Sequence, residues 1–348
     1  MKRLGIWLRH GCLVIEWLLG VLWGAVSWII PRKRRRPVAD VYNSFKHPKG
    51  IYVFGRVLTE RRLIPPSPED GMWLNFRRMA SQWFTREIPK AFIEIHIGDQ
   101  KFERRSDAEG YFVFHHDELI EVDKVTVCLP GYGYEKDYPL ISHYTTPPLV
   151  VISDVDDTLM ETGAVSLGKM LKTTLFGNSL TRELVDGVSE VIQELNAGGR
   201  NPVFYITSSP WNLAHFLKRV FIRAELPMGG LFMTDWGLTP EYWITPSHDK
   251  HKRQAIDQVV AWFPDSKYVL LGDDSQMDPD IYAGALRDYP EMVDGIFIRN
   301  VSDDIVANRV AKQYAELNKE YGELAFTFSG TQEMRTQMRK IGLLPSGE

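Results

Sequence analysis

The sequence predicts an α/β protein in which a parallel sheet carries helices on both faces, preceded by a small β-sandwich domain and an N-terminal hydrophobic helix. Three observations lead to this prediction. Apolar runs of strand length alternate with helix-like stretches in the second half of the chain. Short segments with a period of two precede them, and a long apolar run lies near the start. We therefore predict three parts, residues 1–36, 37–147 and 148–348.

The N-terminal hydrophobic helix is predicted over residues 11–30, which contain a single charged residue, Glu16. This is about the length that a helix needs to cross the roughly 30 Å apolar layer of a membrane. Three basic residues precede the run and five follow it, so the positive-inside rule places the rest of the chain in the cytoplasm. We expect residues 1–36 to form a single membrane anchor with its basic flank. The alternative is a helix buried against the soluble domain or a partner.

The middle part, residues 37–147, is predicted to hold a linker and a small sandwich. Its first residues, 37–50, are polar and punctuated by proline, which is typical of a linker. Strands are predicted over residues 51–58, 91–98 and 124–130, with a further strand after a turn at residues 108–110. Short strands at near-regular spacing indicate an antiparallel sandwich. Cys12 and Cys128 are too few for a disulfide framework.

The pair Pro147–Pro148 marks the boundary of the third part, because it stiffens the chain and interrupts strand or helix pairing. Strands are predicted at residues 149–155, 202–207, 229–236, 268–274 and 295–300, and helices at residues 181–196, 209–221 and 251–263. The tail from residue 305 is helical and charged. In sheets of this kind ligands bind beyond the C-terminal ends of the strands, so we expect the functional site there.

The first polar cluster is Asp154-Val155-Asp156-Asp157-Thr158, at the end of the first of these strands. Residues two apart on a strand point to the same side, so Asp154 and Asp156 project together. Two neighbouring carboxylates repel each other, and a cation between them keeps both ionised. Oxygen ligands of this kind suit Mg²⁺, which keeps several waters and shares a substrate phosphate. The cluster therefore predicts a magnesium site.

Three further polar clusters follow in order. Thr207-Ser208-Ser209-Pro210 ends a strand and opens a helix, where a hydroxyl and free amides can cradle a phosphate. Lys250 or Lys252, at the head of a helix, can neutralise phosphoryl oxygens. Gly272-Asp273-Asp274, with Asp278 one helical turn beyond, adds carboxylates for a metal. Each cluster alone could be a helix cap or a surface lysine, but their order on strand ends predicts one site.

These segments carry a family resemblance. DVDDT resembles the DxDxT signature of the haloacid dehalogenase superfamily, and the later clusters resemble its remaining motifs. More narrowly, VISDVDDTL, YITSSPWNL, HK before an amphipathic helix, and LLGDDSQMDPDIY are similar to the actin-patch-associated phosphatidate phosphatases of fungi and their bacterial relatives. The resemblance covers roughly residues 148–300 and implies a Rossmann-like, haloacid dehalogenase-like sheet. The relatives tend to have a small residue in place of Asp274, which puts the role of Asp274 in doubt.

The resemblance implies a two-step phosphatase mechanism. Asp154 is expected to attack phosphorus and form an aspartyl-phosphate. Asp156 is expected to protonate the leaving oxygen and then to activate the hydrolytic water. Mg²⁺ is expected to be bound by Asp154, by the main-chain carbonyl of Asp156 and by Asp273.

The resemblance also implies that Thr207, Ser208 and Lys252 hold the phosphoryl oxygens, with Lys250 as the rival for the lysine. The expected substrate is a membrane lipid phosphate, phosphatidate being hydrolysed to diacylglycerol, because the predicted anchor would keep the site near lipid headgroups. A soluble or protein-bound phosphomonoester is the alternative. A non-catalytic lipid-binding sensor is disfavoured because both aspartates of the motif are present. The net charge of −4 gives no indication of nucleic acid binding.

Overall fold

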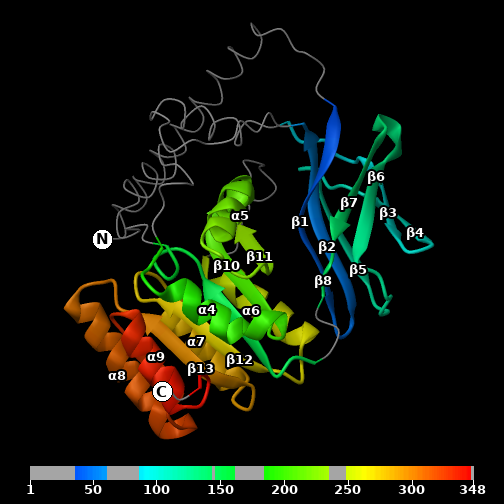
Figure 1. Cartoon of the computed structure of the whole chain (residues 1–348). Coiled ribbons are helices and arrows are strands. Elements are labelled where there is room, and N and C mark those ends of the chain that lie inside the picture. Colours follow the sequence, from blue (N-terminus) through cyan, green and yellow to red (C-terminus); the bar gives the residue numbers. More distant parts are fainter. Residues whose placement is uncertain (1–35, 61–85, 143–145, 161–183, 235–247, 346–348) are drawn as a thin grey trace, which may run out of the picture. The chain divides into compact units, whose positions relative to one another are not determined.

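The computed structural model describes residues 36–60, 86–142, 146–160, 184–234 and 248–345. The described residues from Pro37 onward belong to one compact unit. It contains a six-stranded sheet covered by helices and two four-stranded sheets (Figure 1). The predicted α/β class is therefore confirmed, and antiparallel strands precede the parallel sheet as expected.

The six-stranded sheet is parallel throughout and has the order β11-β10-β9-β12-β13-β14. Its strands are β9 (Leu149–Asp154), β10 (Val203–Pro210), β11 (Gly230–Thr234), β12 (Lys267–Asp273), β13 (Val293–Arg299) and β14 (Ala325–Phe328). The first strand in the chain, β9, has β10 on one side and β12 on the other. The strand order thus reverses at β9, and ligands of such sheets bind beyond the carboxyl ends at this reversal.

Helices cover both faces of the parallel sheet, as predicted. They are α4 (Val188–Asn196), α5 (Ala214–Arg223), α6 (His248–Trp262), α7 (Asp278–Asp288), α8 (Asp304–Tyr321) and α9 (Thr331–Lys340). Alternate residues of a strand point to opposite faces. Val151 of β9 accordingly packs in a core with α4, α5 and α9, whereas Val150 and Ile152 pack in a second core with α6, α7 and α8.

The preceding residues form two four-stranded sheets, β5-β2-β1-β8 and β4-β3-β6-β7, around a third core. Their strands are β1 (Pro37–His47), β2 (Gly50–Thr59), β3 (Phe92–Ile97), β4 (Gln100–Arg105), β5 (Tyr111–His116), β6 (Lys124–Leu129), β7 (Tyr134–Pro139) and β8 (Ile141–Ser142). Pairing is antiparallel except between β1 and β8. The strands predicted at residues 51–58, 91–98 and 124–130 are found as β2, β3 and β6.

The linker predicted over residues 37–50 is wrong, because β1 occupies most of this range and pairs with β2 along its length. Its polar side chains are buried with specific partners. The Asn43 amide donates to the carbonyl of Leu231 and accepts from its N–H, and Lys46 Nζ donates to the carbonyl of Val122. The polar residues of this range are typical of a linker exposed to solvent. In β1 they instead form hydrogen bonds with main-chain groups that lie far away in the sequence.

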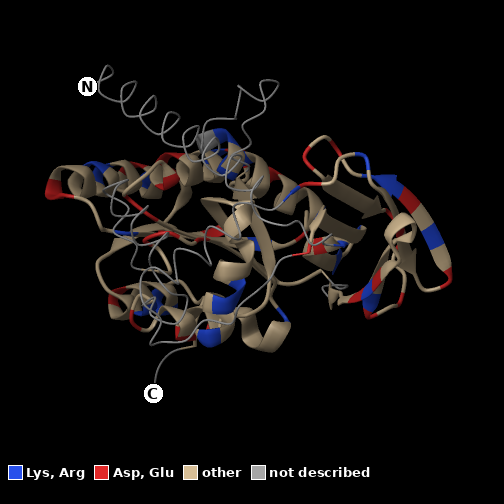
Figure 2. Cartoon of the chain, turned by 90° about the horizontal axis from the view of Figure 1, so that it is seen from above, with Lys and Arg blue, Asp and Glu red and all other residues tan. Residues whose placement is uncertain are grey.

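The predicted N-terminal helix over residues 11–30 lies outside the described residues, and the anchor stays a prediction. Within the described part of the chain, no helix is both long and apolar enough to cross a membrane. The helical tail is found as α8 and α9, with the unpredicted strand β14 between them. Acidic and basic residues are interspersed along the described ribbon (Figure 2).

Candidate active site

Asp154 is the last residue of β9, and only 1% of its surface is exposed. The turn that follows contains Asp157 with a φ of 57°, a conformation that Asp tolerates better than most residues. Arg299 Nη1 donates to the carbonyl of Asp157 at 2.9 Å. Thr158 Oγ1 lies 3.3 Å from Oδ2 of Asp154 and 3.3 Å from Oδ2 of Asp273. The turn is therefore held from β13 and is joined to the end of β12.

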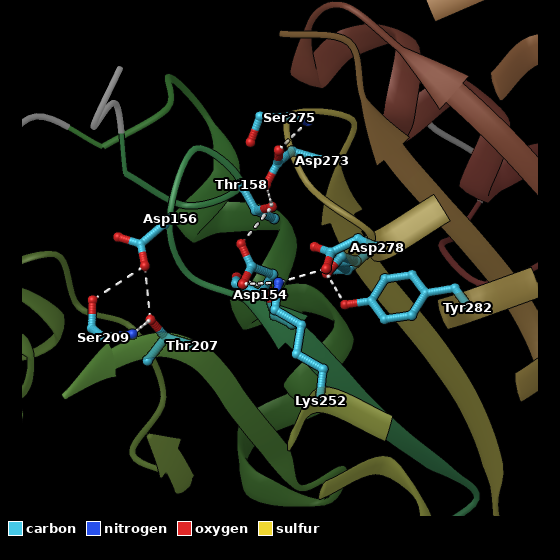
Figure 3. Close-up of polar contacts among 12 residues, drawn as sticks. Asp154, Asp156, Thr158, Thr207, Ser209, Lys252, Asp273, Ser275, Asp278 and Tyr282 are labelled. Atoms are coloured by element: carbon cyan, nitrogen blue, oxygen red, sulfur yellow. Dashed lines mark hydrogen bonds and ion pairs between the residues drawn. The ribbon is translucent and has the colours of Figure 1, made fainter. Parts of the chain in front are cut away.

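Lys252 enters this site from the first turns of α6 and is buried. Its Nζ lies 2.7 Å from Asp154 Oδ1 and 2.5 Å from Asp278 Oδ1 (Figure 3). Burial works against its charge, but the carboxylates of Asp154 and Asp278 outweigh burial and raise the pKa of this ammonium group above its ordinary value. Lys250, the rival in the sequence, is exposed. The geometry therefore favours Lys252 as the cation of the site.

Three buried carboxylates converge at the ends of β9 and β12. Ligand atoms of Asp154, Asp273 and Asp278 all lie within 4.8 Å of one another, a spacing that could hold a metal ion. Asp278 begins α7, and Gly272 leaves the space for it, because a Cβ on Gly272 would lie 2.8 Å from Asp278 Oδ2.

This cluster of three carboxylates fits a divalent cation. All three side chains offer oxygen, the donor that Mg²⁺ prefers. Oδ2 of Asp278 is buried and has no hydrogen-bond partner among the described residues. One lysine faces three carboxylates, so Lys252 alone leaves an excess of negative charge. A divalent ion would offset that excess and favour the ionised carboxylates.

The side chain of Asp156 points away from the cluster of three carboxylates described above and toward the end of β10 (Figure 3). Its Oδ2 accepts from Thr207 Oγ1 at 2.7 Å and from Ser209 Oγ at 3.3 Å. The Ser209 N–H in turn donates to Thr207 Oγ1 at 2.9 Å. Ser208 between them has a buried Oγ with no partner among the described residues, so this hydroxyl can serve a ligand. Residues 207–210, which include these three hydroxyl side chains, are the end of β10.

Burial changes the acidity of these aspartates. It raises the pKa of Asp154 well above its ordinary value, against the effect of Lys252 and with the help of the other carboxylates. Burial and Asp278 raise the pKa of Asp273 to about 7. Burial also raises the pKa of Asp156, and the hydrogen bonds from Thr207 and Ser209 partly offset it. An acid with a raised pKa is suited to giving up and recovering a proton near neutral pH.

The structure brings the predicted site residues together at the carboxyl ends of β9, β10 and β12 and the start of α6. They are Asp154, Asp156, Thr207, Ser208, Lys252 and Asp273. The three carboxylates that could hold a metal include Asp278, which the predicted ligand set lacks. The carboxylate of Asp156 lies outside this cluster, and the ligand predicted from Asp156 is its main-chain carbonyl. The sequence offered Asp278 in the fourth cluster as a carboxylate for a metal, but the ligand set that the resemblance implies does not include it. Its approach to Asp154 depends on how α7 packs on β12.

Asp274, whose role the sequence left in doubt, binds the loop before α8. Its Oδ1 accepts from the N–H groups of Val301 and Ser302, each at 2.8 Å. Ser302 Oγ donates back to the carbonyl of Asp274 at 3.0 Å. These bonds tie the end of β12 to the loop before α8, which is a structural task.

Comparison with known proteins bears on the same residues. Residues 149–300 match the sequence model of a family described as the catalytic domain of phosphatidate phosphatase APP1. Phosphatidate phosphatase APP1 of Saccharomyces cerevisiae is 27% identical over 165 residues, which are 47% of this chain and 28% of that protein. An uncharacterized protein of Schizosaccharomyces pombe is 26% identical over 236 residues, 61% of this chain and 38% of that protein. The matches thus span well under half the length of each relative.

Among solved structures, a chain of the Pnkp1/Rnl/Hen1 complex is similar with a TM-score of 0.33 and 18% identity, covering 46% of this chain and 48% of that chain. A likeness this weak carries no argument. The family match and the yeast relative support a phosphatase, that is, a hydrolase. Residues 149–300, which contain every site residue named above, therefore form a domain similar to the catalytic domain of phosphatidate phosphatase APP1.

Proposed function

We propose that this chain is a Mg²⁺-dependent phosphatase of the haloacid dehalogenase type that hydrolyses a lipid phosphate monoester, with phosphatidate as substrate and diacylglycerol as product. One observation carries the proposal. Asp154 lies buried beside Lys252 in a cluster of carboxylates that could hold a metal, while Asp156, two residues away, is held apart by a hydrogen bond from Thr207 at the end of β10. A nucleophile, a separate acid and a cation thus meet at the reversal point of a parallel sheet.

Asp154 and Asp156 divide the chemistry between two steps. In the first, a carboxylate oxygen of Asp154 attacks phosphorus, the bond from phosphorus to the ester oxygen breaks, and Asp156 gives its proton to the leaving alcohol. In the second, water attacks the aspartyl-phosphate, and Asp156 takes a proton from that water. The bond from phosphorus to Asp154 then breaks, which releases inorganic phosphate and restores both aspartates.

Other residues of the site bind the phosphoryl group. The Lys252 ammonium and the hydroxyls of Thr207 and Ser208 would hold the phosphoryl oxygens. Asp154 and Asp273, joined by Asp278 and by the main-chain carbonyl of Asp156, would hold Mg²⁺. When bound, Mg²⁺ supplies positive charge that reduces repulsion between the nucleophile and the phosphate.

Two features support a lipid substrate. The yeast relative is a phosphatidate phosphatase by name, and residues 11–30 of this chain have the length and composition of a membrane anchor. We propose that this anchor holds the catalytic domain at the cytoplasmic face of a membrane. A soluble phosphomonoester is the second candidate, in which case the anchor would serve location only.

Phosphate release from phosphatidate in mixed micelles, with Mg²⁺ and then with excess chelator, tests the proposal. We expect release that depends on Mg²⁺ and falls by roughly 1,000-fold or more in Asp154→Asn and in Asp156→Asn, which keep the shape of each side chain. Asp274→Asn is the matched control and should retain activity. Release from soluble esters alone would favour the second candidate. Near-normal turnover in Asp156→Asn would sink its assignment as acid and base.

A further inference from the structure

The β-sandwich packs against the residue that follows the end of β10. Trp211, the next residue, is 7% exposed and packs on two aromatic side chains of the sandwich, whose own ring centroids are 5.9 Å apart. Its ring centroid is 4.8 Å from that of Tyr42 on β1, with an angle of 22° between the planes, and 4.7 Å from that of Phe54 on β2. The three rings thus form one cluster, and we call Tyr42 and Phe54 the aromatic pair.

Polar contacts also join β1 to the helical segment that begins at Trp211. Lys218 Nζ of α5 donates to the carbonyl of Tyr42 at 2.7 Å. His215 Nε2, one turn earlier, lies 2.7 Å from Asp40 Oδ2 of β1. The sandwich strand β1 therefore contacts successive turns of α5 as well as the indole that begins the segment.

The segment has no cap of its own that would fix where it begins. It starts with a 3₁₀ turn, η3 (Trp211–Leu213), and continues directly into α5. Neither η3 nor α5 has a side-chain capping hydrogen bond at its N-terminus. Helix starts are normally held by such a bond or by apolar contacts around the first turn. Here the sandwich supplies ring contacts to Trp211, while Leu213 and Ala214 are buried in the core on one face of the parallel sheet.

The position of this helix start determines the geometry of the site. Thr207 and Ser209, which hold Asp156 Oδ2, lie within four residues of Trp211. A shift of the indole is therefore passed along the last residues of β10 to the two hydroxyls. Catalytic geometry is sensitive to such shifts, because a misplacement of about 1 Å can cost about 100-fold in rate.

We propose that Tyr42 and Phe54 are positioning residues of the phosphatase site. By packing on Trp211 they hold the end of β10, and through it they hold the carboxyl group of Asp156 at the position where the leaving oxygen departs. The sandwich thus helps to set the geometry of the active site. This inference rests on the proposed function, because it assumes that Asp156 is the general acid.

The test compares two phosphate esters with full-length protein and Mg²⁺. A good leaving group such as para-nitrophenolate needs little protonation, whereas the alkoxide of an alkyl phosphate such as glycerol phosphate needs the acid. In Phe54→Leu and in Trp211→Leu, we expect kcat for the alkyl ester to fall by about 10- to 100-fold and kcat for the aryl ester by less than about threefold. Trp211→Phe, which keeps a ring against the aromatic pair, should recover most of the loss.

Phe114→Leu is the matched control. Phe114 also belongs to the sandwich and is 1% exposed, but it packs on Phe102 and makes no ring contact with Trp211. A loss of folded protein would reduce turnover of both esters equally, in this variant as in Phe54→Leu. Equal losses on the two esters, or no loss in Phe54→Leu and Trp211→Leu, would overturn the positioning role. If the wild-type protein releases no phosphate from these esters or from phosphatidate in mixed micelles, the proposed function itself fails.

Discussion

At the scale of single residues, the site depends on one buried positive charge. Lys252 is enclosed with Asp154 and Asp278, and each of the three side chains is almost completely removed from water. A buried ion pair contributes little relative to an apolar replacement, but removing one partner leaves the other charge uncompensated. The carboxylates and the lysine therefore stabilise the fold only as a group.

Replacing Lys252 by Met should lower both stability and activity. We expect the free energy of unfolding to fall by about 3 kcal/mol, because two buried carboxylates lose their cation, and phosphate release to be lost. Urea unfolding and the phosphatase assay measure the two effects. Lys250→Met is the control, and its exposed position predicts a change within about 0.5 kcal/mol. The reverse ranking of the two variants would contradict the assignment of Lys252.

Gly272→Ala should displace the side chain of Asp278 from its place in the site. The added Cβ would lie 2.8 Å from Asp278 Oδ2 and 2.8 Å from Tyr282 Cε2, so the carboxylate must move. Overpacking of this kind costs about 1–3 kcal/mol, and we expect weaker activation by Mg²⁺ as well. Thermal unfolding and a Mg²⁺ titration of activity check both. Gly284→Ala, on α7 and facing only the flexible end of Arg253, should be neutral or stabilising by up to about 1 kcal/mol.

At the scale of elements, the loop contacts of Asp274 join the end of β12 to the start of α8. The carboxylate accepts two main-chain N–H bonds, which an asparagine oxygen can also accept. Asp274→Ala should therefore lower the free energy of unfolding by about 1–3 kcal/mol, since two N–H groups lose their acceptor. Asp274→Asn should remain close to wild type in stability and in kcat. A large loss of kcat in a fully folded Asp274→Asn protein would show that the residue serves catalysis.

The elements that the sequence predicted well are those with strong apolar runs. β9, β10, β12 and β13 are buried on both faces, so their sequences are continuously apolar and easy to recognise. β4 and β7 were missed because most of their residues are exposed and charged. β14 was missed because a strand of four residues between two helices has too few positions to show a period.

The site was predicted to a similar extent, and for a related reason. The carboxyl ends of parallel strands lie at one edge of the sheet. The sequence therefore predicted that Asp154, Thr207 and Asp273 lie close together. The sequence could not show which oxygens face each other across that edge. The approach of Asp278 to Asp154 and the turning of Asp156 toward Ser209 both depend on tertiary packing.

At the scale of the whole described unit, aromatic residues of the sandwich also pack on α6. His47 of β1 stacks on Trp262, with ring centroids 5.3 Å apart, and is 4% exposed. Its Nδ1 accepts from the Lys49 N–H at 3.2 Å. Burial, assisted by His115, lowers the pKa of His47 to about 4. The neutral imidazole is therefore the form that the folded protein selects.

Acid should weaken this contact in a defined pH range. The folded pKa of His47 is about 4 and the ordinary value is 6.5, so only the unfolded chain binds the proton between them. Stability due to His47 is complete above pH 6.5, falls as the pH falls, and is lost at about pH 4. We expect wild type to lose about 2 kcal/mol more than His47→Gln over this range. Identical pH dependence in urea unfolding would contradict the prediction.

The Asn43 amide has one more consequence. It satisfies both main-chain groups of Leu231 on β11, the outermost strand of the catalytic sheet. An uncovered edge strand is a template for pairing with other chains, which leads to aggregation. A protein cut at Pro148 would keep every proposed catalytic residue but would lose this cover. Poor solubility of such a fragment would then reflect an unprotected sheet edge, and a charged side chain introduced on β11 should improve it.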